Sequence, residues 1–111
     1  MYIYNVTINV DDSIHEEWLS WIHNHIQDVL ATGQFVSAKL TQVLVKEEMG
    51  GTTYSVQYTA NTREDLDKYY EAYAPKLRDE GLHKFRDKML SFRTELKVVK
   101  EFFPKNTTSL K

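Results

Sequence analysis

His25 has the strongest claim to chemistry in this sequence, because an imidazole near neutral pH can accept or donate a proton. At 100° per residue on a helix it falls in the apolar sector that also holds Trp18, Trp21 and Val29. Tyr58 is one of the tyrosines expected on the inner side of the central strands, near this imidazole; the others are Tyr2, Tyr4 and Tyr54. His25 is therefore the candidate catalytic base, with Tyr58 beside it, although a packed structural histidine is the more common case. The alternative is a packed histidine that donates to a backbone carbonyl or to a tyrosine.

Two arginines and three further side chains are candidates for ligand binding. Arg78 and Arg93 each offer a planar fork of donors that suits a carboxylate or a phosphate, although single arginines are often members of surface ion pairs. Trp21 is expected beside His25, where it would contact a ligand held between helices and sheet. Asn5 and Gln57 are expected on the opposite face of the sheet, where a ligand could lie between two facing sheets.

A metal site is not expected from the four histidines. His23 and His25 point about 200° apart on a helix, and His15 lies about 15 Å from His25 along the axis. The chain contains no cysteine, so disulfides, thiolate chemistry and cysteine-bound metals are excluded together. We expect no metal and no cofactor.

Hydrophobic periodicity predicts the element order strand, helix, strand, strand, helix, strand. The expected strands cover residues 2–10, 35–45, 52–60 and 92–103, and the expected helices follow the capping residues 11–13 and Thr62. The first helix should end near Gly33, because glycine suits a left-handed C-terminal position. Pro75 and Gly81 are expected to divide the second helix into two or three pieces.

This order fits an α+β fold of the ferredoxin-like βαββαβ type, with both helices on one face of a four-stranded antiparallel sheet. The first and third strands would lie in the middle. A chain of 111 residues suits one domain, expected over residues 1–103, with residues 104–111 as a flexible tail.

The face of the sheet without helices should carry small, neutral polar side chains in its middle. These are Asn5, Thr7, Asn9, Ser55, Gln57 and Thr59. Charge is expected only on the edge strands, at Lys39, Arg93, Glu95 and Lys97. A freely solvated sheet usually carries charges across its middle, so this pattern predicts that a second copy covers the face in a homodimer. The alternative is a monomer with a hydrated sheet.

Charge and hydropathy exclude several classes of partner. The chain has 14 Lys and Arg against 16 Asp and Glu, a net charge of -2, so nothing suggests nucleic-acid binding through phosphates. Residues 1–6 match the first-strand motif of RNA-recognition domains, but Thr53 and Ser55 stand where that family stacks bases on aromatic rings. No apolar run could span a membrane, and no signal segment follows Met1, so a cytoplasmic location is expected.

A set of short motifs resembles one bacterial family over about residues 2–98. The motifs are Tyr4-Asn5-Val6-Thr7, Trp18 to Trp21, His25-Ile26, Thr32-Gly33, Phe35, Thr53-Tyr54, Val56-Gln57-Tyr58, Tyr70, Ala74-Pro75, Leu77-Arg78, Gly81, Phe85 and Phe92-Arg93-Thr94. On these residues the chain resembles the uncharacterised family called domain of unknown function 4286, typical of Bacteroidetes. The resemblance implies no activity. More distantly, the layout is similar to dimeric α+β barrel proteins, which include cofactor-free monooxygenases, haem enzymes and binding proteins.

Three functions are compatible with these observations. The first is a small dimeric protein that binds a small molecule between helices and sheet or between facing sheets. The second is a cofactor-independent oxygenase or isomerase-type enzyme, with His25 as base, Tyr58 beside it and Arg93 orienting an acidic substrate. The third is a protein-interaction module, which would present an exposed apolar patch not used by the dimer.

Overall fold

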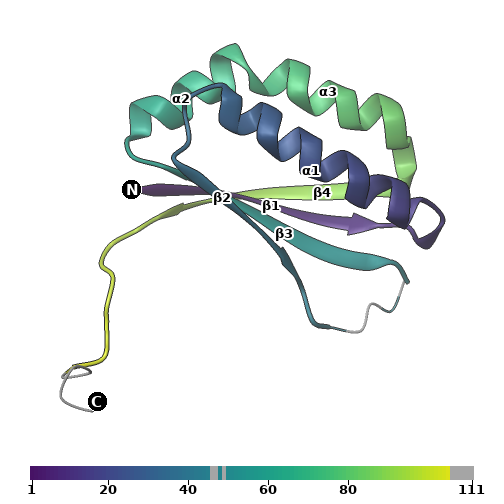
Figure 1. The fold of residues 1–111 in the computed structure, drawn as a ribbon, viewed down its shortest axis with the longest axis horizontal. Helices are drawn as coiled ribbons and strands as arrows, with labels where there is room; N and C mark the ends of the chain where they lie inside the picture. The colour runs from purple at the N-terminus through teal and green to yellow at the C-terminus, as the bar shows by residue number, and fades with distance from the viewer. Residues whose placement is uncertain (46–47, 49, 106–111) are drawn as a thin grey trace.

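The computed structural model describes residues 1–45, 48 and 50–105, and shows one sheet with all helices on the same side of it (Figure 1). The strands are β1 Tyr2–Val10, β2 Ser37–Gln42, β3 Thr52–Ala60 and β4 Met89–Lys97; the helices are η1 Asp12–Ile14, α1 His15–Ala31, α2 Arg63–Ala72, α3 Ala74–Phe85 and η2 Arg86–Lys88. All strand pairs are antiparallel, in the order β2-β3-β1-β4. The ferredoxin-like α+β prediction is confirmed, including the central position of the first and third strands.

Residues of β1 alternate strictly between the two faces of the sheet. Tyr4 and Val6 are buried under the helices, whereas Asn5 and Thr7 lie on the open face, opposite Gln57 and Ser55 of β3. This alternation follows from the period of two in an extended chain. The predicted polar row of the two central strands is therefore confirmed.

The residues predicted to cap α1 form the short helix η1 in front of it. Asp11 accepts hydrogen bonds from the backbone amide and the hydroxyl of Ser13, at 2.9 and 2.5 Å, and so starts η1. At the other end Gly33 has φ of 82°, the left-handed conformation expected after the helix.

The second helical region begins as predicted and breaks once. Thr62 accepts a hydrogen bond from the Asp65 amide at 3.1 Å, which caps α2. Tyr73 separates α2 from α3, where Pro75 lies in the first turn and needs no hydrogen-bond partner for its nitrogen. The expected break at Gly81 is wrong, because α3 continues through it to Phe85. Gly81 has a packing role, since a Cβ there would lie 2.8 Å from Cη2 of Trp21.

The last strand is the main correction to the sequence-based prediction. β4 runs from Met89 to Lys97 rather than over residues 92–103, and pairs Arg93 with Val6 and Phe92 with Thr7. Since Val6 faces the helices, Arg93 does too, and Phe92 faces outward with 67% of its surface exposed. The prediction that Arg93, Glu95 and Lys97 lie on the open face is wrong. Most side chains of this edge strand are exposed on both faces of the sheet. Hydrophobic alternation alone therefore predicted the wrong inner face for β4.

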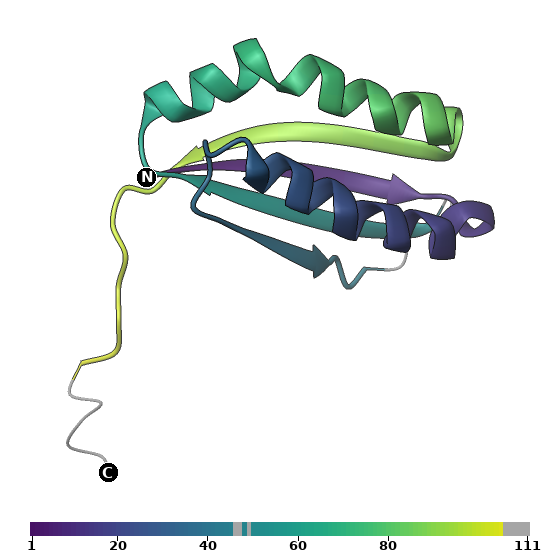
Figure 2. The same ribbon diagram turned by 45° about the horizontal axis from the view of Figure 1, so that its top comes forward.

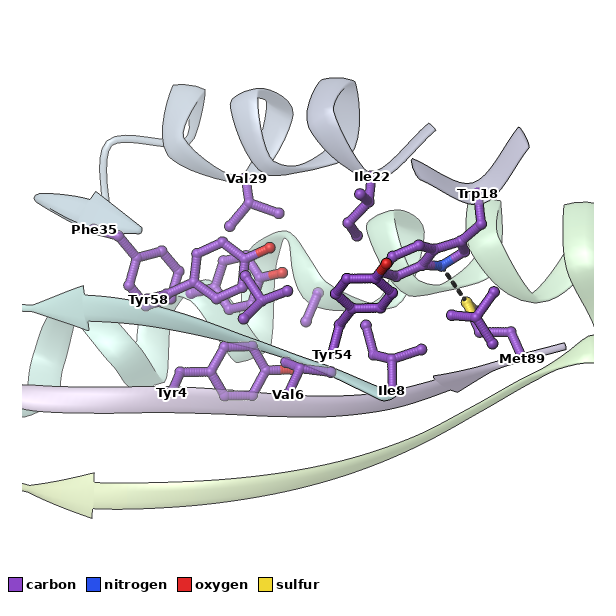
Figure 3. Packing of buried hydrophobic residues seen from close by; sticks show 14 of the residues in the cluster. Tyr4, Val6, Ile8, Trp18, Ile22, Val29, Phe35, Tyr54, Tyr58 and Met89 are labelled. Carbon is purple, nitrogen blue, oxygen red and sulfur yellow. Dashed lines mark hydrogen bonds between the residues drawn. The ribbon is translucent and has the colours of Figure 1, made fainter. Parts of the chain in front are cut away.

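The core lies between the sheet and the helices (Figure 3). Trp18, Ile22 and Val29 of α1 are almost fully buried over the side chains of β1 and β3. Trp18 Nε1 donates a hydrogen bond to Met89 Sδ at 3.2 Å, which joins α1 to the start of β4. A buried indole N–H usually finds such a partner.

After β4 the chain leaves the domain. Residues 98–105 run away from the sheet on the side opposite the helices (Figure 2). Of the tail predicted at residues 104–111, residues 106–111 lie outside the described part. No helix within the described residues has the length and apolar character needed to cross a membrane.

Candidate functional site

Two arginines converge on one tyrosine hydroxyl beneath the helices. Arg78 of α3 donates from Nη2 to Tyr4 Oη at 2.9 Å, and Arg93 of β4 donates from Nε to the same oxygen at 3.0 Å. A phenol oxygen can accept two hydrogen bonds and still donate its own proton. Tyr4 is only 3% exposed and Arg78 is half-buried, whereas Arg93 is exposed. The tyrosine hydroxyl therefore lies inside the domain, and Arg93 reaches it from the surface.

Neither arginine forms an ion pair within the described residues, and the nearby carboxylate of Glu95 instead accepts a hydrogen bond from Tyr70 Oη at 2.6 Å. The ion pairs within the described residues join Arg63 to Asp67 and Glu95, and Lys84 to Glu17. Arg78 instead lies over aromatic rings, with its Cζ 5.9 Å from the ring centre of Tyr4. Ring faces attract cations but leave the guanidinium donors free.

A cavity of about 40 Å³ adjoins the two arginines. Its walls come from β1, β3, β4, α1, α2 and α3, so it occupies the space between helices and sheet. The volume would hold roughly three water molecules at the 10–15 Å³ that each requires. The site is therefore suited to a small polar group rather than to a large substrate.

His25 lines this cavity and carries a nitrogen that is free to bind. Its ring stacks on Trp21 at 4.5 Å between centroids, and its Nδ1 is buried with no hydrogen-bond partner in the described part of the chain. Burial lowers the pKa of His25, a nearby Asp28 raises it in part, and Arg93 lowers it further. The imidazole is thus neutral at neutral pH.

Tyr58 and Trp21 also line the cavity, as predicted from the sequence. Burial, followed by the neighbouring Tyr69 and Tyr4, raises the pKa of Tyr58, so this residue stays a neutral phenol. Such a group can donate a proton in a hydrogen bond but does not serve as a base. Trp21 takes its position because Gly81 of α3 leaves room for the indole.

Asn5 and Gln57 do not belong to this cavity. They lie opposite each other on the open face of the sheet. Ser55 donates to Asn5 Oδ1 at 2.6 Å, and Asn5 Nδ2 donates to Thr7 Oγ1 at 3.2 Å. The predicted site residues therefore separate into a group under the helices, namely His25, Tyr58, Trp21, Arg78 and Arg93, and a pair on the opposite face.

The other histidines make separate local contacts. His15 Nε2 lies 2.6 Å from Tyr54 Oη, and His23 Nδ1 donates to the carbonyl of Leu19 at 2.6 Å. Within the described residues no three histidines or carboxylates gather as a metal site would require.

The sequence interpretation missed Tyr4 as the common partner of the two arginines. Tyr4 was expected only as one inner tyrosine among several, and its hydroxyl became distinctive because β4 turns Arg93 toward the helices. If β4 is turned so that its charged residues face the helices, Arg93 comes close to Arg78 and both can reach Tyr4. Ser91 of β4, on the same inner face, was also missed as a cavity residue.

Comparison with solved structures supports the fold. A candidate antibiotic biosynthesis monooxygenase from Deinococcus radiodurans is similar with a TM-score of 0.64 and 8% identity, over 94% of this chain and 98% of its own. Two dimeric ferredoxin-like proteins from an uncultured marine organism are similar with TM-scores of 0.63 and 0.60 and identities of 11% and 14%. They align over 91% and 93% of this chain and 97% and 98% of their own. At such low identities the similarity supports the fold and gives no information on activity.

No curated protein matches the sequence. A family described as "Domain of unknown function (DUF4286)" matches residues 1–99, which include both strands and helices of the cavity. The motif resemblance found in the sequence is thereby confirmed. The chain belongs to the DUF4286 family.

Proposed function

We propose that this protein is a homodimer that binds a small molecule in the cavity between its helices and its sheet. The observation that carries the proposal is the convergence of Arg78 and Arg93 on Tyr4 Oη beside this cavity. Buried polar groups are normally satisfied within the protein, because leaving them unpaired costs about 1–3 kcal/mol. Two unpaired atoms in the described structure, Arg78 Nε and His25 Nδ1, belong to residues of this one cavity. A ligand with polar atoms would satisfy both.

Ligand binding is tested by titrating the isotope-labelled protein with a set of small neutral and charged fragments. The indole N–H resonance of Trp21, assigned with Trp21→Phe, is the reporter inside the cavity. Trp18 serves as the matched control, because its indole donates to Met89 Sδ in the core. Fragments that move the Trp21 signal and leave the Trp18 signal in place support the proposal. A complete set without effect on Trp21 contradicts it.

The dimer is proposed to form through the open face of the sheet. Leu90, Phe92 and Leu96 of β4 expose 56%, 67% and 45% of their surfaces. Phe102 and Phe103 lie 80% and 77% exposed on the segment that leaves the sheet on this same side (Figure 2). Exposed apolar area of this kind marks an interaction surface, and the two marine proteins of similar fold are described as dimeric.

The polar row in the middle of this face suits coverage by a second copy. Asn5, Thr7 and Ser55 satisfy one another, and Asn9 Nδ2 donates to Thr53 Oγ1 at 3.1 Å. Groups already paired lose little when water is removed from them. Light scattering at micromolar concentration should give twice the chain mass of 13.1 kDa, and a monomer mass would contradict the proposed dimer. A mass above the dimer would mean a larger assembly and would also contradict the proposed dimer.

The enzymatic alternative is not favoured. It needs His25 as base and a substrate that reaches it, and the similarity to the candidate monooxygenase is only 8% in identity. The cavity beside His25 is also small for an aromatic or polyketide-sized substrate.

A further inference from the structure

The cavity between helices and sheet carries an excess of positive charge. Arg78 and Arg93 both donate to Tyr4 Oη, which is neutral and cannot balance them. Ion pairs in the described residues involve other basic side chains, of which Arg63 pairs with Asp67 and Glu95 on the surface. Arg93 is exposed to water, whereas Arg78 is half-buried and its Nε is buried without a partner in the described structure. A guanidinium donor that is removed from water and left unpaired is unfavourable, and an anion bound there would gain charge-assisted hydrogen bonds.

The free donors around the cavity point to an acceptor-rich group. Arg78 keeps its Nε–H, which is buried and unpaired in the described structure, and Tyr4 keeps its own O–H. His25 Nδ1 is buried and unpaired in the same wall, and it can carry the imidazole proton toward a ligand. These are three donors from three elements, α3, β1 and α1. A carboxylate, which only accepts hydrogen bonds, matches this set.

The size of the cavity restricts the anion further. About 40 Å³ corresponds to roughly three water-sized positions, which suits the three heavy atoms of a carboxylate group. A phosphate is tetrahedral and presents oxygens in every direction, so it fits a partly apolar lining less well than a carboxylate with an apolar end. Apolar side chains of the lining, such as Leu77 and Ile22, leave room only for a short carbon chain.

We propose that the ligand is a small monocarboxylic acid whose carboxylate accepts hydrogen bonds from Arg78 Nε, the Tyr4 hydroxyl and His25 Nδ1, with Arg93 holding Tyr4 in place. This assignment rests on the proposed ligand-binding function and names its ligand class. Arg78, Tyr4 and His25 contact the acid directly. Arg93 is a positioning residue, because its Nε is already bound to Tyr4 Oη.

The test compares acids with amides of the same shape. Acetate and propionate are titrated against acetamide and propionamide, with the Trp21 indole N–H as the reporter. The acids should bind at least about tenfold more tightly than the amides, since hydrogen bonds to a charged acceptor are stronger than those to a neutral one. Arg78→Gln should weaken acetate binding about tenfold or more and leave acetamide binding unchanged.

Matched variants separate the cavity from the protein as a whole. Arg63→Gln removes a guanidinium that lies in surface ion pairs outside the cavity, so acetate affinity should stay the same. Tyr4→Phe keeps the ring and removes the hydroxyl, and should weaken acetate about tenfold at unchanged far-ultraviolet circular dichroism. If Arg78→Gln does not fold, Tyr4→Phe and wild-type acid-against-amide selectivity still decide the matter.

The possible outcomes distinguish the carboxylate assignment from the ligand-binding proposal on which it rests. Amides that bind as tightly as acids, or inorganic phosphate that binds more tightly than acetate, overturn the carboxylate assignment and leave the ligand-binding cavity intact. An unchanged acetate affinity in Arg78→Gln has the same meaning. If no acid, amide or phosphate moves the Trp21 resonance, the cavity does not bind small molecules, and both proposals fail.

Discussion

The two faces of one sheet treat their polar groups in opposite ways. On the open face, Asn5, Thr7 and Ser55 form hydrogen bonds with each other. Under the helices, Arg78 Nε and His25 Nδ1 stay buried and unpaired in the described structure. Polar side chains that bond to each other lose little when a second copy covers them, whereas buried unpaired atoms gain from a ligand that brings polar partners. The difference is the basis for the proposed protein interface on one face and the proposed binding cavity on the other.

Breaking the open face should have the largest effect. Phe92→Glu places a charge in the middle of the apolar side chains of β4, and should weaken the proposed dimer by about 2–4 kcal/mol, as for a central interface residue. Sedimentation equilibrium measures this change as a shift toward monomer. Leu82→Glu is the control, because Leu82 is an exposed apolar residue of the helix layer, 51% accessible. Equal dissociation by both variants would contradict the assigned interface.

A larger side chain at Gly81, in the helix layer, should have the next largest effect on stability. Gly81→Ala gains up to about 1 kcal/mol of helix propensity, but its Cβ would lie 2.8 Å from Trp21 Cη2, and overpacking costs about 1–3 kcal/mol. The net change in the free energy of unfolding should therefore be destabilising. Trp21 should also be displaced toward the cavity, which weakens ligand binding.

Urea unfolding gives the stability change and near-ultraviolet circular dichroism reports the displaced indole. The neighbouring helix position provides the control, because Glu80→Ala alters an exposed side chain without entering the core. A stabilised Gly81→Ala protein with unchanged acetate binding would mean that Trp21 moves freely at this site.

The pH dependence of stability should originate partly on the helix side. Burial lowers the pKa of His25 in the folded state, so the unfolded chain binds the proton more readily. The stability is therefore fully present above the ordinary histidine pKa of 6.5, and is lost as the pH falls below it toward the lowered folded pKa. His25→Gln should flatten this decline. His83→Gln, at an exposed position of α3, should not. Thermal unfolding between pH 5 and pH 8 would reveal either result.

The sequence predicted the central strands better than the edge. The faces of Tyr4 and Asn5 were predicted correctly, because helices cover one side of β1 and its buried and less buried residues alternate strictly. β4 was assigned to the wrong face because its apolar residues, such as Phe92, point outward. On an edge strand, alternation reports which side is apolar and does not report what covers it.

The position of β4 at the edge of the sheet also limited the prediction of the cavity. His25 and Trp21 followed from helical periodicity, and both line it. Arg93 was proposed as a ligand-binding residue from its chemistry alone, while its expected face was wrong. Its convergence with Arg78 on Tyr4 depends on the β1–β4 register, which no local pattern encodes.

The smallest effect should come from one hydrogen bond of the open face. Ser55→Ala removes the donor at 2.6 Å from Asn5 Oδ1, and should cost about 0.5–1.5 kcal/mol where the face is covered by a second copy. In the Phe92→Glu monomer, water reaches Asn5 and replaces the lost donor, so the cost should be close to zero. A double-mutant cycle of urea unfolding and sedimentation measures this coupling, which is expected between groups that share one interface. An equal cost of Ser55→Ala in both backgrounds would mean that the row is equally hydrated with and without Phe92, and would place the dimer contact elsewhere.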